Sequence, residues 1–230
     1  MGNKNIFITS TGTNIGKTYC TVQILKEMLH RKVLFNAYKP ILSGFNISNI
    51  KDSDSYKILK TNNKKPNLED IRKISPWLFE KAIAPSIAAK KENKSLKYND
   101  VLEWCLKKSD NKIINIFEGA GGLLVPIEKT KTILDLMKDL NSKVVLVVGN
   151  YLGSVSHTLS AVQNLEHANL KIINIIINKN INSGDIDMED TERLLISSIK
   201  KKIKIRKVNF KDNFNSTSIK KITGDIISSY

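Results

Sequence analysis

The chain has 230 residues, of which 41% are hydrophobic and 26% charged, and its formal net charge is +15. These proportions are ordinary for a globular protein, and the length suits one α/β domain with a sizeable core. No apolar run approaches the roughly 18 residues of a transmembrane helix, and the N-terminus lacks signal-peptide features, so a membrane protein or secreted precursor is not expected.

The positive charge suggests a nucleic-acid partner, but the residue types argue against it. Only four of the 37 basic residues are arginine, whereas base readout and bidentate phosphate recognition favour arginine. The densest cluster, KKKIKIRK at residues 200–207, alternates as an exposed edge strand protected by lysines does. We therefore expect a lysine-rich surface, with neither nucleic acid nor membrane as a partner.

The two cysteines, Cys20 and Cys105, fall in helix-like segments and have no metal-ligand spacing. Reduced thiols are therefore expected rather than a disulfide, which is consistent with a cytoplasmic protein.

Strands and helices alternate along the chain. In the N-terminal half, the patterns predict a strand at 5–10, a helix from Lys17 to about Arg31, a strand at 33–38, a helix at 51–60, a polar loop at 64–70, a short helix within 75–91, and a helix at 98–108 capped by Asn99 or Asp100. In the C-terminal half they predict strands at 113–117, 143–149 and 171–178, helices ending near His167 and spanning about 188–199, a weaker strand near 203–208 and a tail helix from about Ser216.

Apolar strands that alternate with amphipathic helices predict a mostly parallel sheet with helices on both faces. There is no repeat and no linker-like segment, so residues 1–230 are expected to form one domain. Ligands bind at the carboxyl ends of the strands in such sheets, and the motifs described next follow predicted strands.

The first motif is TSTGTNIGKT at residues 9–18. Its end, Gly16-Lys17-Thr18, follows a strand and opens a helix, as a phosphate-binding loop of P-loop NTPases does, although the common pattern places glycine where this chain has Thr11. In such a loop Lys17 reaches the β- and γ-phosphates, and the Thr18 hydroxyl binds Mg²⁺.

Two further segments supply carboxylates and a lysine. Glu118 directly follows the apolar strand at 113–117, where a carboxylate is costly unless it binds a metal or a cation. Asp52 and Asp54 offer another carboxylate or a helix cap. Lys39 ends the second strand, where it can stabilise a transferring phosphoryl group or simply lie on the surface. His157 has no nucleophile or metal spacing around it and is expected on a helix surface.

The motifs TSTGTNIGKT, AYKPILSG, SDSY, EGAGGLLVP, VVGNYLGSVSHT and IIIN, in this order, together resemble the dethiobiotin synthetase family over roughly residues 4–180. The family loop is one residue longer, G-T-x-T-x-x-G-K-T. On that spacing Thr11, Thr13, Gly16, Lys17 and Thr18 match, Ser10 replaces a glycine, and Asn14 replaces a commonly acidic residue.

The resemblance implies an ATP- and Mg²⁺-dependent ligase that joins 7,8-diaminononanoate and CO₂ into dethiobiotin. It implies the following roles: catalysis by Lys39, Lys17 and Thr13; nucleotide binding by Asn14, Ile15, Gly16, Lys17, Thr18, Tyr19, Asp54, Glu118, Gly119, Ala120, Gly121, Asn178 and Lys179; metal binding by Thr18, Asp54 and Glu118; substrate binding by Ser43, Gly153, Ser154 and Ser156. Within the nucleotide set, Asn178 is expected to hydrogen-bond the adenine edge.

The resemblance also implies a homodimer with active sites at the interface, where the segment 151–156 offers backbone amides to the partner's substrate carboxylate. The family's proline-containing adenine segment has no clear match at residues 205–210. The main alternative is a nucleotide-switch ATPase of the partitioning or septum-site kind. Those proteins carry a lysine near the loop start, which residues 10–13 lack. A cobyrinate-amidating ligase would need a glutaminase domain, for which the chain has no room.

Overall fold

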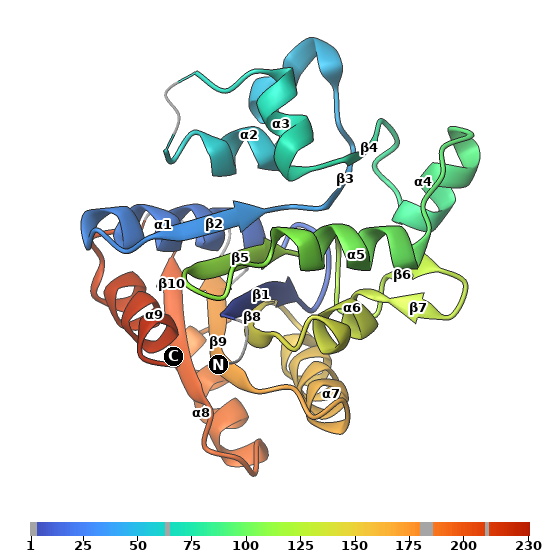
Figure 1. Ribbon diagram of the computed structural model, residues 1–230. Helices are drawn as coiled ribbons and strands as arrows, with labels where there is room; N and C mark the ends of the chain where they lie inside the picture. Colours follow the sequence, from blue (N-terminus) through green and yellow to red (C-terminus); the bar gives the residue numbers. More distant parts are fainter. Residues whose placement is uncertain (1–3, 63–64, 180–185, 210–211) are drawn as a thin grey trace.

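Six parallel strands form the central sheet of the computed structural model, which describes residues 4–62, 65–179, 186–209 and 212–230 (Figure 1). Their spatial order is β10 (Lys204–Asn209), β9 (Ile172–Lys179), β8 (Lys143–Gly149), β1 (Asn5–Ser10), β5 (Ile114–Glu118) and β2 (Phe35–Tyr38). This arrangement confirms the predicted fold class. All six strands were predicted, five from their apolar runs and β10 as a weaker strand near 203–208.

Both faces of this sheet are buried under hydrophobic side chains. Successive side chains along a strand point to opposite faces, so each strand contributes to both hydrophobic clusters. On β8, Val144, Leu146 and Val148 belong to one hydrophobic cluster, whereas Val145 and Val147 belong to the other. The first cluster includes residues of α5 (Tyr98–Lys108), α6 (Ile133–Asp139), α7 (Ser154–His167) and α8 (Met188–Ser198). The second includes residues of α1 (Lys17–His30) and α9 (Thr217–Ile227), on the opposite side of the sheet in Figure 1.

A smaller layer stands over the carboxyl end of β2 (Figure 1). It contains the parallel pair β3 (Ile41–Ser43) and β4 (Trp77–Phe79), the 3₁₀ helix η1 (Ile47–Asp52), α2 (Asp54–Leu59), α3 (Leu68–Ile74) and α4 (Pro85–Lys91). A short antiparallel hairpin, β6 (Pro126–Glu128) and β7 (Lys131–Thr132), precedes α6.

The structure corrects two local predictions. Residues 64–70 are not all loop, because α3 begins at Leu68; the Asn67 side chain accepts from the Asp70 backbone N–H at 2.9 Å in a reciprocal capping box. Neither Asn99 nor Asp100 caps α5. Its N-cap is Lys97, and Glu128 supplies the missing acceptor by taking the Tyr98 backbone N–H at 2.9 Å.

The lysine-rich segment lies on β10 at the sheet edge, as predicted. Several of its charges are paired: Lys204 and Arg206 contact Asp225 of α9 at 2.5 and 3.1 Å. Both cysteines are buried and free, which confirms the reduced thiols. Among the described residues, no helix is long and apolar enough to cross a membrane.

Candidate active site

The phosphate-loop segment connects the end of β1 at Ser10 to the start of α1 at Lys17. Two of its residues have left-handed backbone, Asn14 with φ 58° and Gly16 with φ 96°. Asparagine tolerates this region better than most residues. Only glycine suits position 16, since a Cβ there would lie 2.2 Å from Nδ2 of Asn178. The loop therefore turns at Asn14 and Gly16.

Ser10, where the family spacing expects glycine, keeps ordinary backbone, because it is not among the described residues with positive φ. Its buried hydroxyl donates to the Gly12 carbonyl at 2.5 Å and accepts from Nζ of Lys17 at 2.9 Å. The Gly12 backbone N–H also approaches this oxygen at 3.3 Å. The serine thus closes the first turn of the loop with its side chain.

Lys17 is the first residue of α1 and is 7% exposed. Its Nζ also donates to the Gly12 carbonyl, at 3.2 Å. Burial and then the nearby charge of Lys39 lower the pKa of Lys17 to about 8, against the opposing effect of two carboxylates. An ammonium has three donors, so a hydrogen remains for a ligand oxygen.

Glu118 lies at the carboxyl end of β5 and is 1% exposed. Oε1 accepts from the Thr18 hydroxyl at 2.6 Å and from Nζ of Lys39 at 2.7 Å. Oε2 accepts from the Thr21 hydroxyl at 2.6 Å. The buried carboxylate is therefore paired and hydrogen-bonded, as its burial requires.

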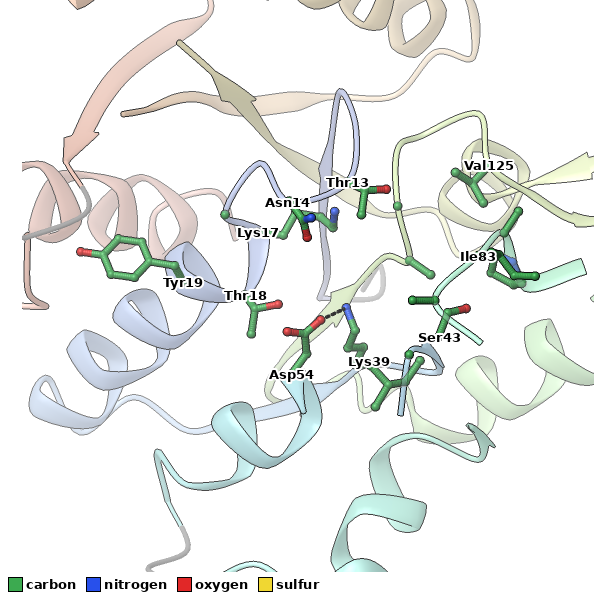
Figure 2. A pocket seen from close by; sticks show the side chains of 18 residues that line it. Thr13, Asn14, Lys17, Thr18, Tyr19, Lys39, Ser43, Asp54, Ile83 and Val125 are labelled. Atoms are coloured by element: carbon green, nitrogen blue, oxygen red, sulfur yellow. Dashed lines mark ion pairs between the residues drawn. The ribbon is translucent and has the colours of Figure 1, made fainter. Parts of the chain in front are cut away.

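Lys39 links the two predicted carboxylates, and Figure 2 shows its ion pair with Asp54. Its Nζ lies 3.1 Å from Oδ2 of Asp54, in addition to its contact with Glu118, and the residue is 4% exposed. Burial lowers the pKa of Lys39, but the charges and hydrogen bonds of Glu118 and Asp54 outweigh it and raise the pKa to about 12. Lys39 is therefore a buried cation, and the surface alternative is wrong.

Asp54 is the first residue of α2, and Ser53 before it is the N-cap, so neither Asp52 nor Asp54 caps the helix. Burial raises the pKa of Asp54, but the charge of Lys39 and hydrogen bonds from Lys39 and Thr18 hold it below its usual value. The hydroxyls of Ser55 and Ser75, 2.6 Å apart and fully buried, tie α2 to the end of α3.

The hydroxyl of Thr18 and the carboxylates of Asp54 and Glu118 form an all-oxygen set, the kind that Mg²⁺ prefers. Two carboxylates gathered around one ammonium can also accept a divalent cation. The residues present therefore fit the metal that the resemblance implies.

A cavity of about 650 Å³ opens beside these groups (Figure 2). Eleven of the predicted site residues line it: Thr13, Asn14, Gly16, Lys17, Thr18, Tyr19, Lys39, Ser43, Asp54, Ala120 and Gly121. Its lining also includes the apolar residues Leu42, Ile83 and Val125, and Ile83 and Val125 lie across from Thr18 in Figure 2. We call these three residues the apolar wall. The polar end thus suits phosphates, and the other end suits an aliphatic chain.

The remaining predicted residues lie outside this lining. Gly119 contributes its carbonyl to Nζ of Lys39 at 3.3 Å. Asn178 is buried and donates to the Ile15 carbonyl at 2.8 Å, so it supports the loop from behind. Lys179 is exposed at the end of β9.

Gly153, Ser154 and Ser156 lie at the start of α7 and do not line this cavity. Gly153 and Ser156 are exposed, whereas Ser154 is buried. His157 is exposed on this helix, as expected, and its Nδ1 lies 2.8 Å from the Tyr151 hydroxyl.

Sequence reasoning missed Thr21 and the apolar wall. Thr21 lies three residues after Thr18 on α1, and this helical spacing was the available signal. The lining residues Ala82–Pro85 follow β4 and come to the site only through the small layer. Tyr19 points away from Lys39 in Figure 2, and its hydroxyl donates to the carbonyl oxygens of Asn209 and Asp212.

Comparison with solved structures agrees with the fold. The cell division ATPase MinD of Pyrococcus furiosus superposes with a TM-score of 0.53 at 13% identity, over 99% of this chain and 100% of that one. A putative plasmid partition protein of Borrelia burgdorferi B31, bound to AMPPNP, gives 0.51 at 16% identity over 99% and 98%. At these identities the similarity shows the fold alone.

Sequence comparison is more specific. A family model described as an AAA domain matches residues 4–212. The ATP-dependent dethiobiotin synthetase BioD of Caulobacter vibrioides (strain NA1000 / CB15N) is 32% identical over 188 residues, 80% of this chain and 84% of that protein. The protein of the same name from Legionella pneumophila (strain Paris) is 35% identical over 169 residues, 73% and 76%. The chain therefore belongs to the ATP-dependent dethiobiotin synthetase family.

Proposed function

We propose that this protein, acting as one domain, catalyses ATP- and Mg²⁺-dependent ring closure of 7,8-diaminononanoate with CO₂ to dethiobiotin. The observation that carries the proposal is the buried cluster in which Lys39 contacts Glu118 and Asp54 beside the phosphate loop. Relatives such as the Caulobacter vibrioides protein are named as ATP-dependent dethiobiotin synthetases.

The proposed chemistry has three steps. One substrate amine adds to CO₂ and forms a carbamate. The carbamate oxygen attacks the γ-phosphorus of ATP, which releases ADP. The second amine then attacks the carbamoyl carbon, closes the ureido ring and expels phosphate.

The chain's residues serve these steps through position and charge. Lys17 and the loop amides bind the triphosphate. Thr18, Asp54 and Glu118 hold Mg²⁺, which neutralises phosphate charge. Lys39 sits between the metal set and the apolar wall, where its ammonium can stabilise the carbamate and the transferring phosphoryl group.

The wall formed by Leu42, Ile83 and Val125 suits the methylene chain of the substrate. Its carboxylate then needs a site beyond the wall. We propose that the start of a partner's α7, at Gly153, Ser154 and Ser156, supplies it in a homodimer.

The test is to incubate purified protein with diaminononanoate, bicarbonate, Mg²⁺ and ATP and to look for the mass of dethiobiotin. Product that requires all four components supports the proposal. ATP hydrolysis stimulated by DNA or lipid, without product, would instead favour a nucleotide-switch ATPase.

A further inference from the structure

A second cavity, of about 740 Å³, lies at the edge of the sheet opposite the phosphate loop. Its lining comes from the amino ends of four adjacent strands, β9, β8, β1 and β5, and from the C-terminal residues Ser229 and Tyr230. None of these residues belongs to the proposed active site. We call this hollow the amino-edge cavity.

Each of the four strands contributes one lysine to the lining. Lys171 precedes β9, Lys143 begins β8, Lys4 precedes β1, and Lys112 lies two residues before β5. Neighbouring strands are about 4.8 Å apart, so the four lysines form a row of roughly 14 Å. Four of the eleven lining residues are thus lysines, and none is acidic.

These lysines lack carboxylate partners. None of the four forms a salt bridge with a carboxylate in the part of the chain that the structure describes, unlike the lysines of β10. Asp110, close in sequence, instead accepts the Lys112 backbone N–H at 2.7 Å. Burial, and then the like charge of Lys171, lower the pKa of Lys143.

Backbone carbonyls accept only some of the hydrogen bonds that the ammonium groups of these four lysines can donate. Nζ of Lys4 donates to the Lys112 carbonyl at 3.1 Å, and Nζ of Lys143 donates to the Ser229 carbonyl. Each ammonium has three donors, so most of them remain available to a ligand.

The hydroxyl of Ser142 is a buried donor without a partner among the described residues, on a residue that lines this cavity. Ser142 lines the amino-edge cavity and is 4% exposed, yet its Oγ has no hydrogen-bond partner in the structure. Buried hydroxyls are normally satisfied. The amides of Asn111, Asn141 and Asn169 add neutral donors around the same space.

We propose that the amino-edge cavity is a second ligand site, which binds a small phosphate-bearing polyanion. Ammonium, hydroxyl and amide donors, with no Asp or Glu side chain among the described residues of the lining, match the acceptor oxygens of such a ligand. A concave site favours a small molecule, whereas a nucleic-acid duplex is bound by a helix or strand pair that enters its groove. The site is independent of the proposed synthetase activity.

The experiment measures tripolyphosphate binding by isothermal titration calorimetry in the Lys17→Ala background, which disables the phosphate loop. The test variant adds Lys112→Gln and Lys171→Gln, leaving the contact of Lys143 with Tyr230 intact. The matched control adds Lys26→Gln and Lys90→Gln, two exposed lysines on α1 and α4. We expect the test pair to weaken binding at least about tenfold and the control pair less than about twofold.

Ser142→Ala should weaken binding about threefold without a change in charge. If the Lys17→Ala protein does not fold, the test and control pairs are titrated in the wild-type background, where the phosphate loop adds the same binding to both. Absence of binding, or equal losses in the test and control pairs, would overturn the proposal. Tighter binding of a single-stranded oligonucleotide through the same lysines would also overturn it, because the ligand class would be wrong.

Discussion

Nζ of Lys17 donates to Oγ of Ser10 at 2.9 Å, across the first turn of the phosphate loop. The hydroxyl and the Gly12 carbonyl together fix the ammonium. Ser10 is therefore a positioning residue for Lys17, in a place where the family spacing expects glycine.

Ser10→Ala should raise the KM for ATP about three- to tenfold and change kcat less. Loss of one hydrogen bond to a charged group costs about 1.5–2 kcal/mol. Part of this cost should appear as weaker ATP binding, because Lys17 is held less firmly. Steady-state kinetics with varied ATP measures the split. An unchanged KM for ATP in folded Ser10→Ala protein would show that Lys17 needs no support from this hydroxyl.

Lys39→Ala should lower kcat by about 10²- to 10³-fold, because in the proposed mechanism it removes a preorganised charge at the reacting centre. It also leaves Glu118 and Asp54 without their shared cation, which should cost about 3 kcal/mol of folding stability. Mg²⁺ should restore part of this stability by replacing the cation.

Thermal unfolding with and without Mg²⁺ measures the effect. Lys94→Ala is the matched control, since Lys94 pairs with Glu92 at 2.8 Å but its side chain is 46% exposed. That change should cost less than about 1 kcal/mol and show no metal dependence. Near-normal turnover of Lys39→Ala would remove Lys39 from the mechanism.

The location of the main site residues could be predicted from local sequence, because each of them follows an apolar strand. Lys17, Lys39 and Glu118 all end up at one edge of the sheet for this reason. The turn at Ser10 could not be judged, since the family pattern gives only the residue type. The structure shows that the Ser10 hydroxyl hydrogen-bonds to the Gly12 carbonyl and to Lys17.

Features that depend on tertiary packing could not be predicted. The wall at Ile83 reaches the cavity because β4 pairs with β3 in a separate small sheet. Helix α6 is only seven residues long and gives too short a periodic pattern to be recognised. Thr21 looks like any polar residue on α1 until β5 places Glu118 against it.

Asp225 should give a pH-dependent contribution to stability. Burial raises its pKa, but Lys204 and Arg206 outweigh burial and hold the pKa below the usual aspartate value. A depressed pKa means that the contribution is present above the unfolded-state value, near 4, and is lost as the pH falls through the folded value.

Asp225→Asn should therefore cost about 1 kcal/mol at pH 7, a modest value because the pair is close to solvent. The difference from wild type in urea unfolding should shrink toward zero below about pH 4. Asp190→Asn, which breaks an exposed pair with Arg193, is the control and should have little effect. A difference that is the same at pH 7 and pH 3.5 would contradict the assignment to charge.

Thr21→Val tests how Glu118 is positioned. The Thr21 hydroxyl holds Oε2 at 2.6 Å, which leaves Oε1 toward Thr18 and Lys39. Without it the carboxylate can rotate, so the apparent Mg²⁺ affinity in the nucleotide complex should fall about tenfold, as for other groups that orient metal ligands. Thr21→Ser should restore it.

Thr158→Val is a matched control. Like Thr21, Thr158 is 1% exposed and donates to the carbonyl four residues earlier, but its hydroxyl contacts no carboxylate. The two valine variants should therefore lose similar stability, whereas only Thr21→Val should require more Mg²⁺ for ADP binding, measured by calorimetry over a range of metal concentrations. Equal Mg²⁺ dependence in both variants would reduce Thr21 to a packing residue. An effect confined to Thr21→Val would instead show that α1, through Thr21, orients the Glu118 carboxylate in the site.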